Sequence, residues 1–210
     1  MRPYYMSMIH AAVYTNSSCI VYNYMGNGTL LDFVNTNCHN PIHHTRIAHQ
    51  ILQMVHTLHQ INIIHGDVKP DNIMVVSSVK SPLGLIPTLR LIDFGQSIDL
   101  AALPPNSAFT YNAGTSGFVC SQMKMNQPWN YHIDFNGIAG TLHVVLHRAY
   151  MKTYQNDVGE WVTTKRLPRV CQDRWKKAFH DLLNFPTPSD EWSPSIHDSP
   201  LPNLIQLFDV

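Results

Sequence analysis

The 210-residue sequence predicts an α+β fold in which a small piece of sheet precedes a mostly helical body. Two apolar runs rich in β-forming residues, 6–14 and 18–24, stand near the start of the chain, and residues 15–17 between them are typical of a hairpin turn. A later stretch, 132–147, is apolar on most sides and indicates a buried helix. Between these regions, apolar residues recur at the spacing of one helical face, at Ile47, Ile51, Met54, Val55 and Leu58.

The amphipathic helix is expected to begin at Asn40-Pro41, because proline is tolerated in a first helical turn, and to end near Gln60. Two short β-type runs follow, 73–76 and 89–92, with a loop that contains Ser, Pro and Gly between them. Residues 95–130 carry a less regular pattern than the segments on either side. The sheet contribution of this half of the chain is therefore expected to be small.

A further helix is predicted over about 172–183, with its apolar residues on one face. Its basic residues, Arg174, Lys176 and Lys177, predict a solvated helix face rather than a docking patch. The end of the chain is expected to be looser, because proline is excluded from helix interiors and central strands. Five prolines fall there: Pro186, Pro188, Pro194, Pro200 and Pro202.

The composition excludes several classes of protein. Hydrophobic residues make up 44% of the chain and charged residues 13%, and the formal net charge is zero. A disordered tail or a dedicated nucleic-acid binder would carry a large net charge, so neither is expected, and no direct nucleic-acid partner is predicted. No apolar run reaches the roughly 18 residues of a membrane span, and no signal peptide is evident, so no membrane association is expected.

Four widely spaced cysteines without a CxxC predict neither a disulfide framework nor a zinc ribbon, which favours a reducing compartment, cytoplasm or nucleus. The thirteen histidines raise the alternative of structural zinc near Cys38-His39, with His43, His44 and His49. No acidic ligand lies nearby, and Pro41 interrupts the helical register. We therefore expect these histidines to occupy exposed polar positions.

One group of polar residues has the types and the spacing of a catalytic site. His65, Asp67, Lys69 and Asn72 form an H-x-D-x-K-x-x-N pattern, which arises by chance at roughly one in 10⁵ starting positions, and Asp93-Phe94-Gly95 follows the next apolar strand. The pattern resembles the catalytic loop and the metal-binding tripeptide of protein kinases. Phosphoryl transfer requires charge placed around the transferring phosphate. Asp67 would accept the proton of the incoming hydroxyl, and Lys69 would neutralise charge on the γ-phosphate. Asn72 and Asp93 would offer oxygen ligands to Mg²⁺.

A second block, Gly114–Gln122, resembles the end of a kinase activation segment, usually G-T-x-x-Y-x-A-P-E. The resemblance implies that Thr115 hydrogen-bonds near Asp67 and Lys69, which marks a Ser/Thr kinase. It also implies that Asp134 holds the backbone of the catalytic loop from below; the alternative is a surface aspartate at a helix start. Gln122 replaces the usual Glu, which removes one buried carboxylate.

The finer pattern is similar to the Bub family of mitotic checkpoint kinases. Its residues are 65–72, 95–99, 115–118 and 128–131. The resemblance implies a protein-kinase-like fold, ATP and Mg²⁺ as cofactors, and a location at the nucleus and kinetochore. It also implies protein substrates, with a core histone tail among them, and checkpoint and kinetochore proteins as partners. Lys69, Asn72 and the Asp93-Phe94-Gly95 tripeptide are kept, as in the active branch of the family. Gly66 stands where most kinases have an Arg that grips a phosphorylated activation loop, so no such phosphate switch is expected.

The same resemblance divides the chain into a remnant of the kinase N-lobe with its last strands and hinge (1–25), the C-lobe (26–185) and a Pro-rich tail with a possible last helix (186–210). Gly26–Leu31 is interpreted as the connector after the hinge rather than as a phosphate loop. Adenine is then expected near Tyr22, against Asn23, Met25 and Met74.

The sequence contains neither G-x-G-x-x-G-x-V nor V-A-I-K, the upper-lobe motifs that cover and bind the phosphates of ATP. We therefore expect the 210-residue chain alone to bind nucleotide weakly or not at all. The alternative to a Ser/Thr kinase is a catalytically impaired, truncated kinase or a pseudokinase that acts as a kinetochore binding or scaffold protein.

Overall fold

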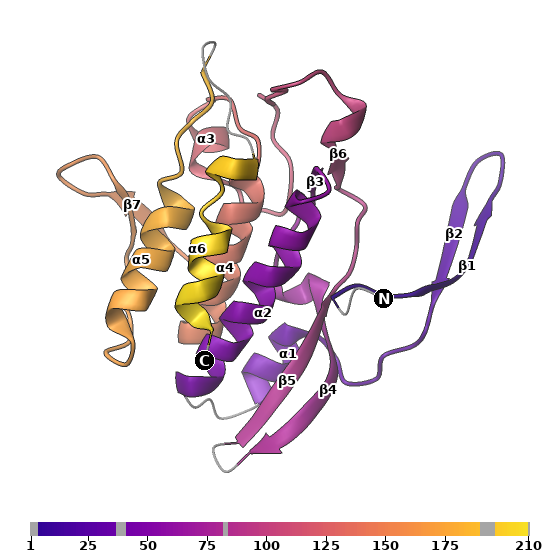
Figure 1. Cartoon of the computed structure of the whole chain (residues 1–210), viewed down its shortest axis with the longest axis horizontal. Coiled ribbons are helices and arrows are strands. Elements are labelled where there is room, and N and C mark those ends of the chain that lie inside the picture. The colour runs from indigo at the N-terminus through magenta and orange to yellow at the C-terminus, as the bar shows by residue number, and fades with distance from the viewer. Residues whose placement is uncertain (1–3, 37–40, 82–83, 190–195, 210) are drawn as a thin grey trace.

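The structure is a computed structural model that describes residues 4–36, 41–81, 84–189 and 196–209. Its helices form one body, and β1 and β2 extend away from that body as a separate hairpin (Figure 1). The helices are α1 (Leu30–Thr36), α2 (Pro41–His59), α3 (Ser121–Lys124), α4 (His132–His147), α5 (Gln172–Leu183) and α6 (Leu201–Phe208). Single 3₁₀ turns cover Pro70–Asn72, Leu100–Ala102 and Ile196–Asp198.

The strands pair only as antiparallel couples within the described residues. The four couples are β1 (Met8–Val13) with β2 (Ser18–Tyr22), β3 (Ile63–Ile64) with β6 (Ile98–Asp99), β4 (Ile73–Ser81) with β5 (Gly84–Leu91), and β7 (Thr153–Gln155) with β8 (Trp161–Thr163). The mixture of helices and short strands confirms the predicted α+β class. The two β-type runs expected at 73–76 and 89–92 are longer than predicted: they continue into one hairpin, Ile73 opposite Leu91 and Lys80 opposite Leu85.

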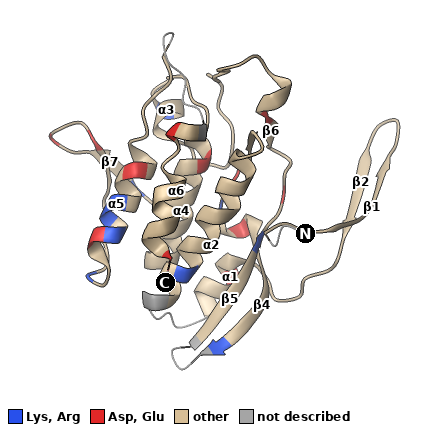
Figure 2. Ribbon diagram, viewed as in Figure 1, with Lys and Arg blue, Asp and Glu red and all other residues tan. Residues whose placement is uncertain are grey.

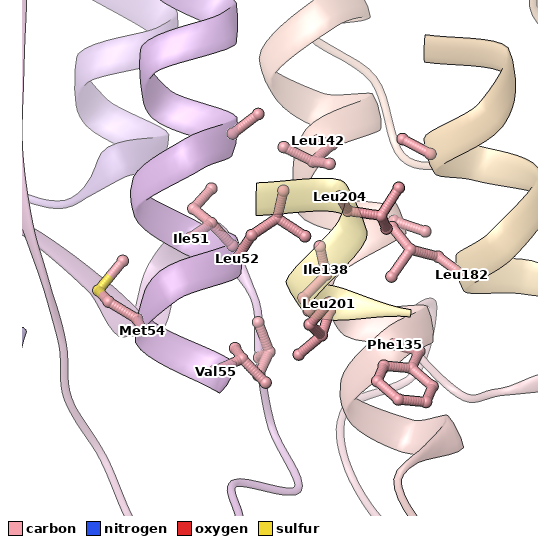
Figure 3. Packing of buried hydrophobic residues seen from close by; sticks show 14 of the residues in the cluster. Ile51, Leu52, Met54, Val55, Phe135, Ile138, Leu142, Leu182, Leu201 and Leu204 are labelled. Carbon is pink, nitrogen blue, oxygen red and sulfur yellow. The ribbon is translucent and has the colours of Figure 1, made fainter. Parts of the chain in front are cut away.

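The core lies where α2, α4, α5 and α6 meet (Figure 3). The predicted apolar face of α2 is buried, and Leu52 points toward Leu204 of α6 (Figure 3). Helix α4 is buried on nearly all sides, as its apolar sequence predicted, because every residue from 132 to 145 is shielded from solvent. Burying such side chains contributes about 1.5–3 kcal/mol each before the loss of chain entropy is counted.

One expectation about polar residues is wrong. His43 and His44 are buried rather than exposed, with 2% and 8% of their surface accessible. Cys38 and His39 lie outside the described residues, and within the described ranges no cluster of three or more His, Cys, Asp or Glu side chains could hold a metal ion. The possible last helix expected within residues 186–210 is present as α6: Pro202 occupies its first turn, where it removes no helical hydrogen bond, and Leu201 and Leu204 are fully buried.

Helix α4 approaches the loop after β3 so closely that one position admits only glycine. A Cβ atom on Gly137 would lie 2.6 Å from the carbonyl oxygen of Val68 and 2.8 Å from its Cβ. Val68 itself is buried with 1% of its surface exposed. The fully buried helix therefore serves as the floor on which the segment 65–72 rests.

The β1–β2 hairpin packs little against the core. All five residues of β2 are exposed, and Ile9, Val13 and Ile20 are among the most exposed apolar side chains, with 60%, 85% and 51% of their surface accessible. None of the helices in the described ranges combines the length and the apolarity that crossing a lipid bilayer requires.

His132, the first residue of α4, is a buried neutral histidine. Its Nδ1 accepts a hydrogen bond from the backbone N–H of Asn130 at 3.1 Å, so the proton resides on Nε2, which donates to the carbonyl oxygen of Pro186 at 2.9 Å. Burial lowers the pKa of His132 from 6.5 to about 4, and the hydrogen bonds to the carbonyls of Pro186 and Phe185 only partly oppose this. The folded chain therefore excludes a proton that the unfolded chain binds.

We predict that His132 makes the fold sensitive to mild acid. Its contribution is fully present above pH 6.5 and is lost as the pH falls toward 4, which amounts to about 3 kcal/mol over the whole interval and about 2 kcal/mol by pH 5. Urea unfolding at pH 7 and pH 5 should show that the free energy of unfolding falls less between these pH values for His132→Gln than for the wild type. His10→Gln, at an exposed position of β1, is the control and should leave the loss unchanged; equal losses in H132Q and wild type would contradict the assignment.

Candidate active site

The segment 65–72 is placed by short backbone ladders on both sides. Before it, Ile63 and Ile64 of β3 pair with β6. After it, the 3₁₀ turn Pro70–Asn72 leads directly into β4, and the carbonyl oxygen of Asn72 accepts a hydrogen bond from the N–H of Ile92 at 2.9 Å. That bond joins the end of the segment to the chain just before Asp93. Two stretches that are distant in sequence are thus brought to one edge of the body.

A buried carboxylate fixes the beginning of the segment. Asp134 of α4 is fully buried, and its Oδ2 accepts hydrogen bonds from the backbone N–H of His65 at 2.8 Å and from Nε2 of His59 at 2.9 Å. Its Oδ1 accepts from the backbone N–H of Gly66 at 2.9 Å. The role predicted for Asp134 is confirmed, and the alternative of a surface aspartate is wrong.

Gly66 is required by this geometry. Its φ is +81°, and a Cβ atom there would lie 2.4 Å from the carbonyl oxygen of Gln96. An L-residue at this position would be strained and would collide with backbone. The glycine that replaces the usual arginine therefore lets residues 65–67 and the backbone at Gln96 pass within contact distance.

Four side chains form one hydrogen-bonded network around Asp67. Lys69 Nζ lies 2.7 Å from Asp67 Oδ2 and donates to Thr115 Oγ1 at 2.6 Å. The hydroxyl of Thr115 in turn donates to Asp67 Oδ1 at 2.7 Å. Asn72 Nδ2 donates to Asp67 Oδ2 at 2.9 Å and to the Asp67 carbonyl oxygen at 3.0 Å. The structure thus joins residues that are up to 48 positions apart in the sequence.

The surroundings of Asp67 hold it in the ionised form. Burial alone acts to raise its pKa and is the largest single influence. Hydrogen bonds from Lys69 and Thr115, the charge of Lys69 and the hydrogen bond from Asn72 together outweigh burial, so the pKa of Asp67 falls below its ordinary value. At neutral pH the network contains a carboxylate that can accept a further hydrogen bond from a hydroxyl.

Asn72 and Asp93 present oxygen atoms of the kind that Mg²⁺ binds. Both hydrogen bonds of the Asn72 side chain are made by Nδ2, and its Oδ1 has no partner among the described residues. Asp93 is exposed and has a φ of +61°; its Oδ1 accepts from the N–H of Gly95 at 3.2 Å, which orients the carboxylate. One amide oxygen and one carboxylate fit a magnesium ion that takes its remaining ligands from phosphate or water.

A cavity of about 340 Å³ adjoins this network, within the usual size range of small-molecule sites. It contains all three residues that the sequence assigned to adenine, Asn23, Met25 and Met74, and it extends to Asp93. The remaining lining is mostly apolar: Met6, Tyr22, Tyr24, Leu91, Ile92 and Phe94. The predicted adenine residues and one of the two predicted metal residues, Asp93, therefore line the same cavity, whereas Asn72 is not part of its lining.

Sequence reasoning missed the aromatic support beside this cavity. The Phe94 ring packs edge-on against His65 at a centroid distance of 5.1 Å and against Tyr5 at 5.9 Å. Tyr5 is held by a hydrogen bond from its hydroxyl to the carbonyl oxygen of Met54 at 2.6 Å. No periodicity marks Tyr5 as a core residue, because it precedes the first strand; only its aromatic character could have drawn attention to it.

The segment that carries Thr115 is tied to the core at its far end. Asn136 of α4 donates to the carbonyl oxygen of Phe118 at 2.7 Å. Gln122, which replaces the usual glutamate, is buried and donates from Nε2 to Thr187 Oγ1 at 3.3 Å. The substitution thus replaces a buried charge with a neutral hydrogen bond.

Comparison with known proteins agrees with this geometry. The family described as protein kinase domain matches residues 2–193. The chain is 36% identical over 193 residues to the mitotic checkpoint serine/threonine-protein kinase BUB1 of Mus musculus, which covers 87% of this chain and 18% of that protein. It is 32% identical over 204 residues to BUB1 of Arabidopsis thaliana, with 85% of this chain and 38% of that protein covered. The chain thus spans less than half the length of these relatives.

Solved structures give the same picture. The crystal structure of the BubR1 kinase domain superimposes with a TM-score of 0.82 at 30% sequence identity, covering 99% of this chain and 62% of that one. The kinase PK-1 of the Cydia pomonella granulovirus, with a TM-score of 0.65 and 16% identity, shares the fold.

We predict that Asp134→Asn destabilises the chain by about 3 kcal/mol, because an amide presents N–H groups to donors that the carboxylate now accepts from. Urea unfolding at pH 7 measures the loss. Asp71→Asn, an exposed aspartate in the neighbouring 3₁₀ turn, is the matched control and should change stability by less than about 0.5 kcal/mol. Similar losses for D134N and D71N would show that the buried carboxylate does not hold the segment.

Proposed function

The chain belongs to the protein kinase family, in its Bub1/BubR1 branch, and from this premise we propose that it transfers the γ-phosphate of ATP to Ser or Thr hydroxyls of proteins in the spindle assembly checkpoint. The observation that carries the proposal is the network in which Lys69 and Thr115 both contact the Asp67 carboxylate. Each of its members has a part in phosphoryl transfer.

Asp67 would orient the attacking hydroxyl and accept its proton. Its lowered pKa makes it a weak base, and this suits the reaction, because the transition state is loose and the nucleophile needs alignment more than early deprotonation. Asn72 and Thr115 restrict the rotation of the carboxylate by donating to both of its oxygens. The carboxylate is therefore positioned before a substrate arrives.

Lys69 would stabilise the negative charge on the transferring phosphate. Its ammonium already contacts Asp67 and Thr115, so little side-chain freedom remains to be lost on binding. The Thr115 hydroxyl connects the cation to the base and ties the activation segment to the catalytic loop. Because Thr115 contacts both residues, Lys69 is correctly placed only when the activation segment is correctly placed.

Protein kinase domains use ATP and Mg²⁺, and we assign the two to neighbouring parts of the site. Asn23, Met25 and Met74 would hold adenine in the 340 Å³ cavity. Asn72 and Asp93 would hold Mg²⁺, which supplies charge neutralisation for the phosphates when it is bound. Asn72 then has two functions, since its Nδ2 positions Asp67 while its Oδ1 stays available to the ion.

The relatives bear the names of mitotic and spindle checkpoint kinases, and we propose the same setting for this chain. It would act in the nucleus and at the kinetochore on protein substrates, a core histone tail among them, and with checkpoint proteins as partners. Gly66 supports activity without a phosphorylated activation loop, because no arginine stands at that position to grip the phosphate.

A second candidate function is a binding or scaffold protein that retains a kinase-like lobe. The exposed hairpin favours it: the faces of β1 and β2 are apolar and accessible, as a binding surface would be. The absence of V-A-I-K and of a glycine-rich phosphate loop from the 210 residues points in the same direction. The two candidates differ in whether this chain binds and consumes ATP.

We predict that Asp67→Asn lowers the rate of phosphate transfer to a Ser/Thr peptide by roughly 10²–10⁴-fold, because the amide cannot take the hydroxyl proton. Labelled ATP at a concentration of about 1 mM with Mg²⁺ gives the rate. Asp71→Asn controls for the chemical change at an exposed site and should keep the wild-type rate. Transfer by D67N at the wild-type rate would remove Asp67 from the role of base.

Nucleotide titration separates the two candidate functions. We predict that the 210-residue chain binds Mg·ATP weakly, with a dissociation constant above roughly 1 mM, because no glycine-rich loop in this sequence covers the phosphates. Isothermal calorimetry with and without Mg²⁺, repeated with Asp93→Asn, measures the affinity and its dependence on the ion. Micromolar affinity would contradict the expectation and favour the kinase; undetectable binding together with undetectable transfer would favour the scaffold.

A further inference from the structure

The charges of this neutral chain are distributed unevenly. Residues 148–177 contain eight of the 14 Lys and Arg residues but only three of the 14 Asp and Glu residues. Figure 2 shows these cations gathering along α5 and the loop that leads into it. A local excess of positive charge on a protein without net charge concentrates the attraction for anionic partners at one place. This place lies on the opposite side of the body from the β1–β2 hairpin (Figure 1).

The basic region borders a groove of about 450 Å³ between β8 and α5. Its floor is apolar, formed in part by the half-buried Trp161 and Leu167 and by Phe179, of which 4% is exposed. Its rim carries three exposed cations that come from both walls: Lys165, Arg166 and Lys176. We call this feature the β8–α5 groove. An apolar floor with a charged rim is the arrangement of a site for a peptide rather than of an ordinary solvated helix face.

Within the described part of the chain, the rim cations have no acidic partner of their own. Lys165, Arg166 and Lys176 form no ion pair with any residue that the structure describes. Of the nearby acids, Asp173 forms no ion pair within the described ranges, and two others are engaged elsewhere. Asp181 pairs with Lys177 at 2.8 Å, and Glu160 contacts His180 at 3.3 Å. The charge of Lys177 is therefore neutralised by Asp181, whereas the charges of Lys165, Arg166 and Lys176 at the groove are not neutralised by an ion pair within the described residues.

The walls of the groove are held in place before any ligand binds. Asn184, just after α5, accepts from the backbone N–H of Trp161 at 2.7 Å through Oδ1 and donates to its carbonyl oxygen at 3.0 Å through Nδ2. The β7–β8 turn is closed by Asn156, whose Oδ1 accepts from the N–H of Glu160 at 2.8 Å. A preformed groove avoids the ordering cost that weakens binding to mobile surfaces.

We propose that the β8–α5 groove binds an acidic peptide segment, in which one apolar side chain enters between Trp161, Leu167 and Phe179 and flanking carboxylates meet Lys165, Arg166 and Lys176. Cations on both walls favour a run of carboxylates along the groove over a single phosphate group, which would need donors that converge on one point. A nucleic acid would use the cations but would not fill the apolar floor. The prediction of a solvated face for Arg174, Lys176 and Lys177 is thereby restricted to Arg174 and to Lys177, which is already paired.

This inference extends the proposed function, since the segment would belong to a protein that the kinase phosphorylates or assembles with. Docking at a distance from the active site raises the local concentration of a substrate without touching the reacting groups. Binding there requires neither ATP nor catalysis. Its failure would leave the phosphotransfer proposal standing, and loss of phosphotransfer would leave the groove intact.

Fluorescence anisotropy with the 210-residue chain tests the proposal. The probe is a labelled dodecapeptide with five Glu or Asp residues on each side of a central Leu-Phe pair. We expect saturable binding at about 0.1 M salt that weakens as salt rises. The triple variant K165E/R166E/K176E should weaken binding at least tenfold, and Leu167→Ser at least threefold. Lys177→Gln removes one positive charge from the same helix at the paired position and should stay within twofold of wild type.

Three further probes decide the ligand class. A peptide with Gln and Asn in place of the acids, and an acidic peptide with Ala-Ala in place of Leu-Phe, should each bind at least tenfold more weakly. A 20-base-pair DNA duplex should bind more weakly than the acidic peptide, and the triple variant should not discriminate between the two. Equal binding of the neutral peptide, tighter binding of DNA, or unchanged affinity in the triple variant would overturn the proposal; circular dichroism of each variant verifies that it is folded.

Discussion

The Asp134 carboxylate is the constraint on which the rest of the site depends. It lies in a fully buried helix, where a charged group is costly unless it is well hydrogen-bonded, and it accepts three hydrogen bonds, from His59, His65 and Gly66. Two of these donors are consecutive backbone N–H groups of the catalytic loop. A single polar group in an apolar helix therefore specifies where the loop begins, and the loop then specifies where Asp67 and Lys69 stand.

Close packing and hydrogen bonding act together at this point. Gly137 lets α4 contact the carbonyl oxygen of Val68, and Gly66 lets the loop pass the backbone at Gln96. The remaining freedom of the loop is removed from above, where Thr115 bridges Asp67 and Lys69. The contacts of Asp134 and Gly137 come from the core helix α4, whereas the contact of Thr115 comes from the segment 114–122, so Asp67 and its neighbours are held from two separate parts of the chain.

Periodicity and motif spacing predicted the parts of the structure that short-range rules govern. The apolar stripe of α2 and the all-round apolar sequence of α4 identified both central helices, and the H-x-D-x-K-x-x-N spacing identified side chains that the structure brings together around Asp67. The failures came from tertiary packing. Burial of His43 and His44 and the support of Phe94 by Tyr5 depend on neighbours distant in sequence, which no local pattern records. The β8–α5 groove likewise required the fold, because Trp161 and Phe179 share its floor only once α5 packs beside β8.

The β1–β2 hairpin has a consequence for how the protein behaves in bulk. Neither strand contains Lys, Arg, Asp, Glu or Pro, the residues that natural sheets place on open edges to discourage pairing with another chain. A two-stranded ribbon is barely stable by itself in water, and its outer edges offer N–H and C=O groups to any extended strand that arrives. Because the chain has no net charge to keep molecules apart, the open edges of β1 and β2 favour aggregation through strand pairing. A strand or surface that covers β1 and β2 would therefore remove an exposed apolar edge as well as form an interface.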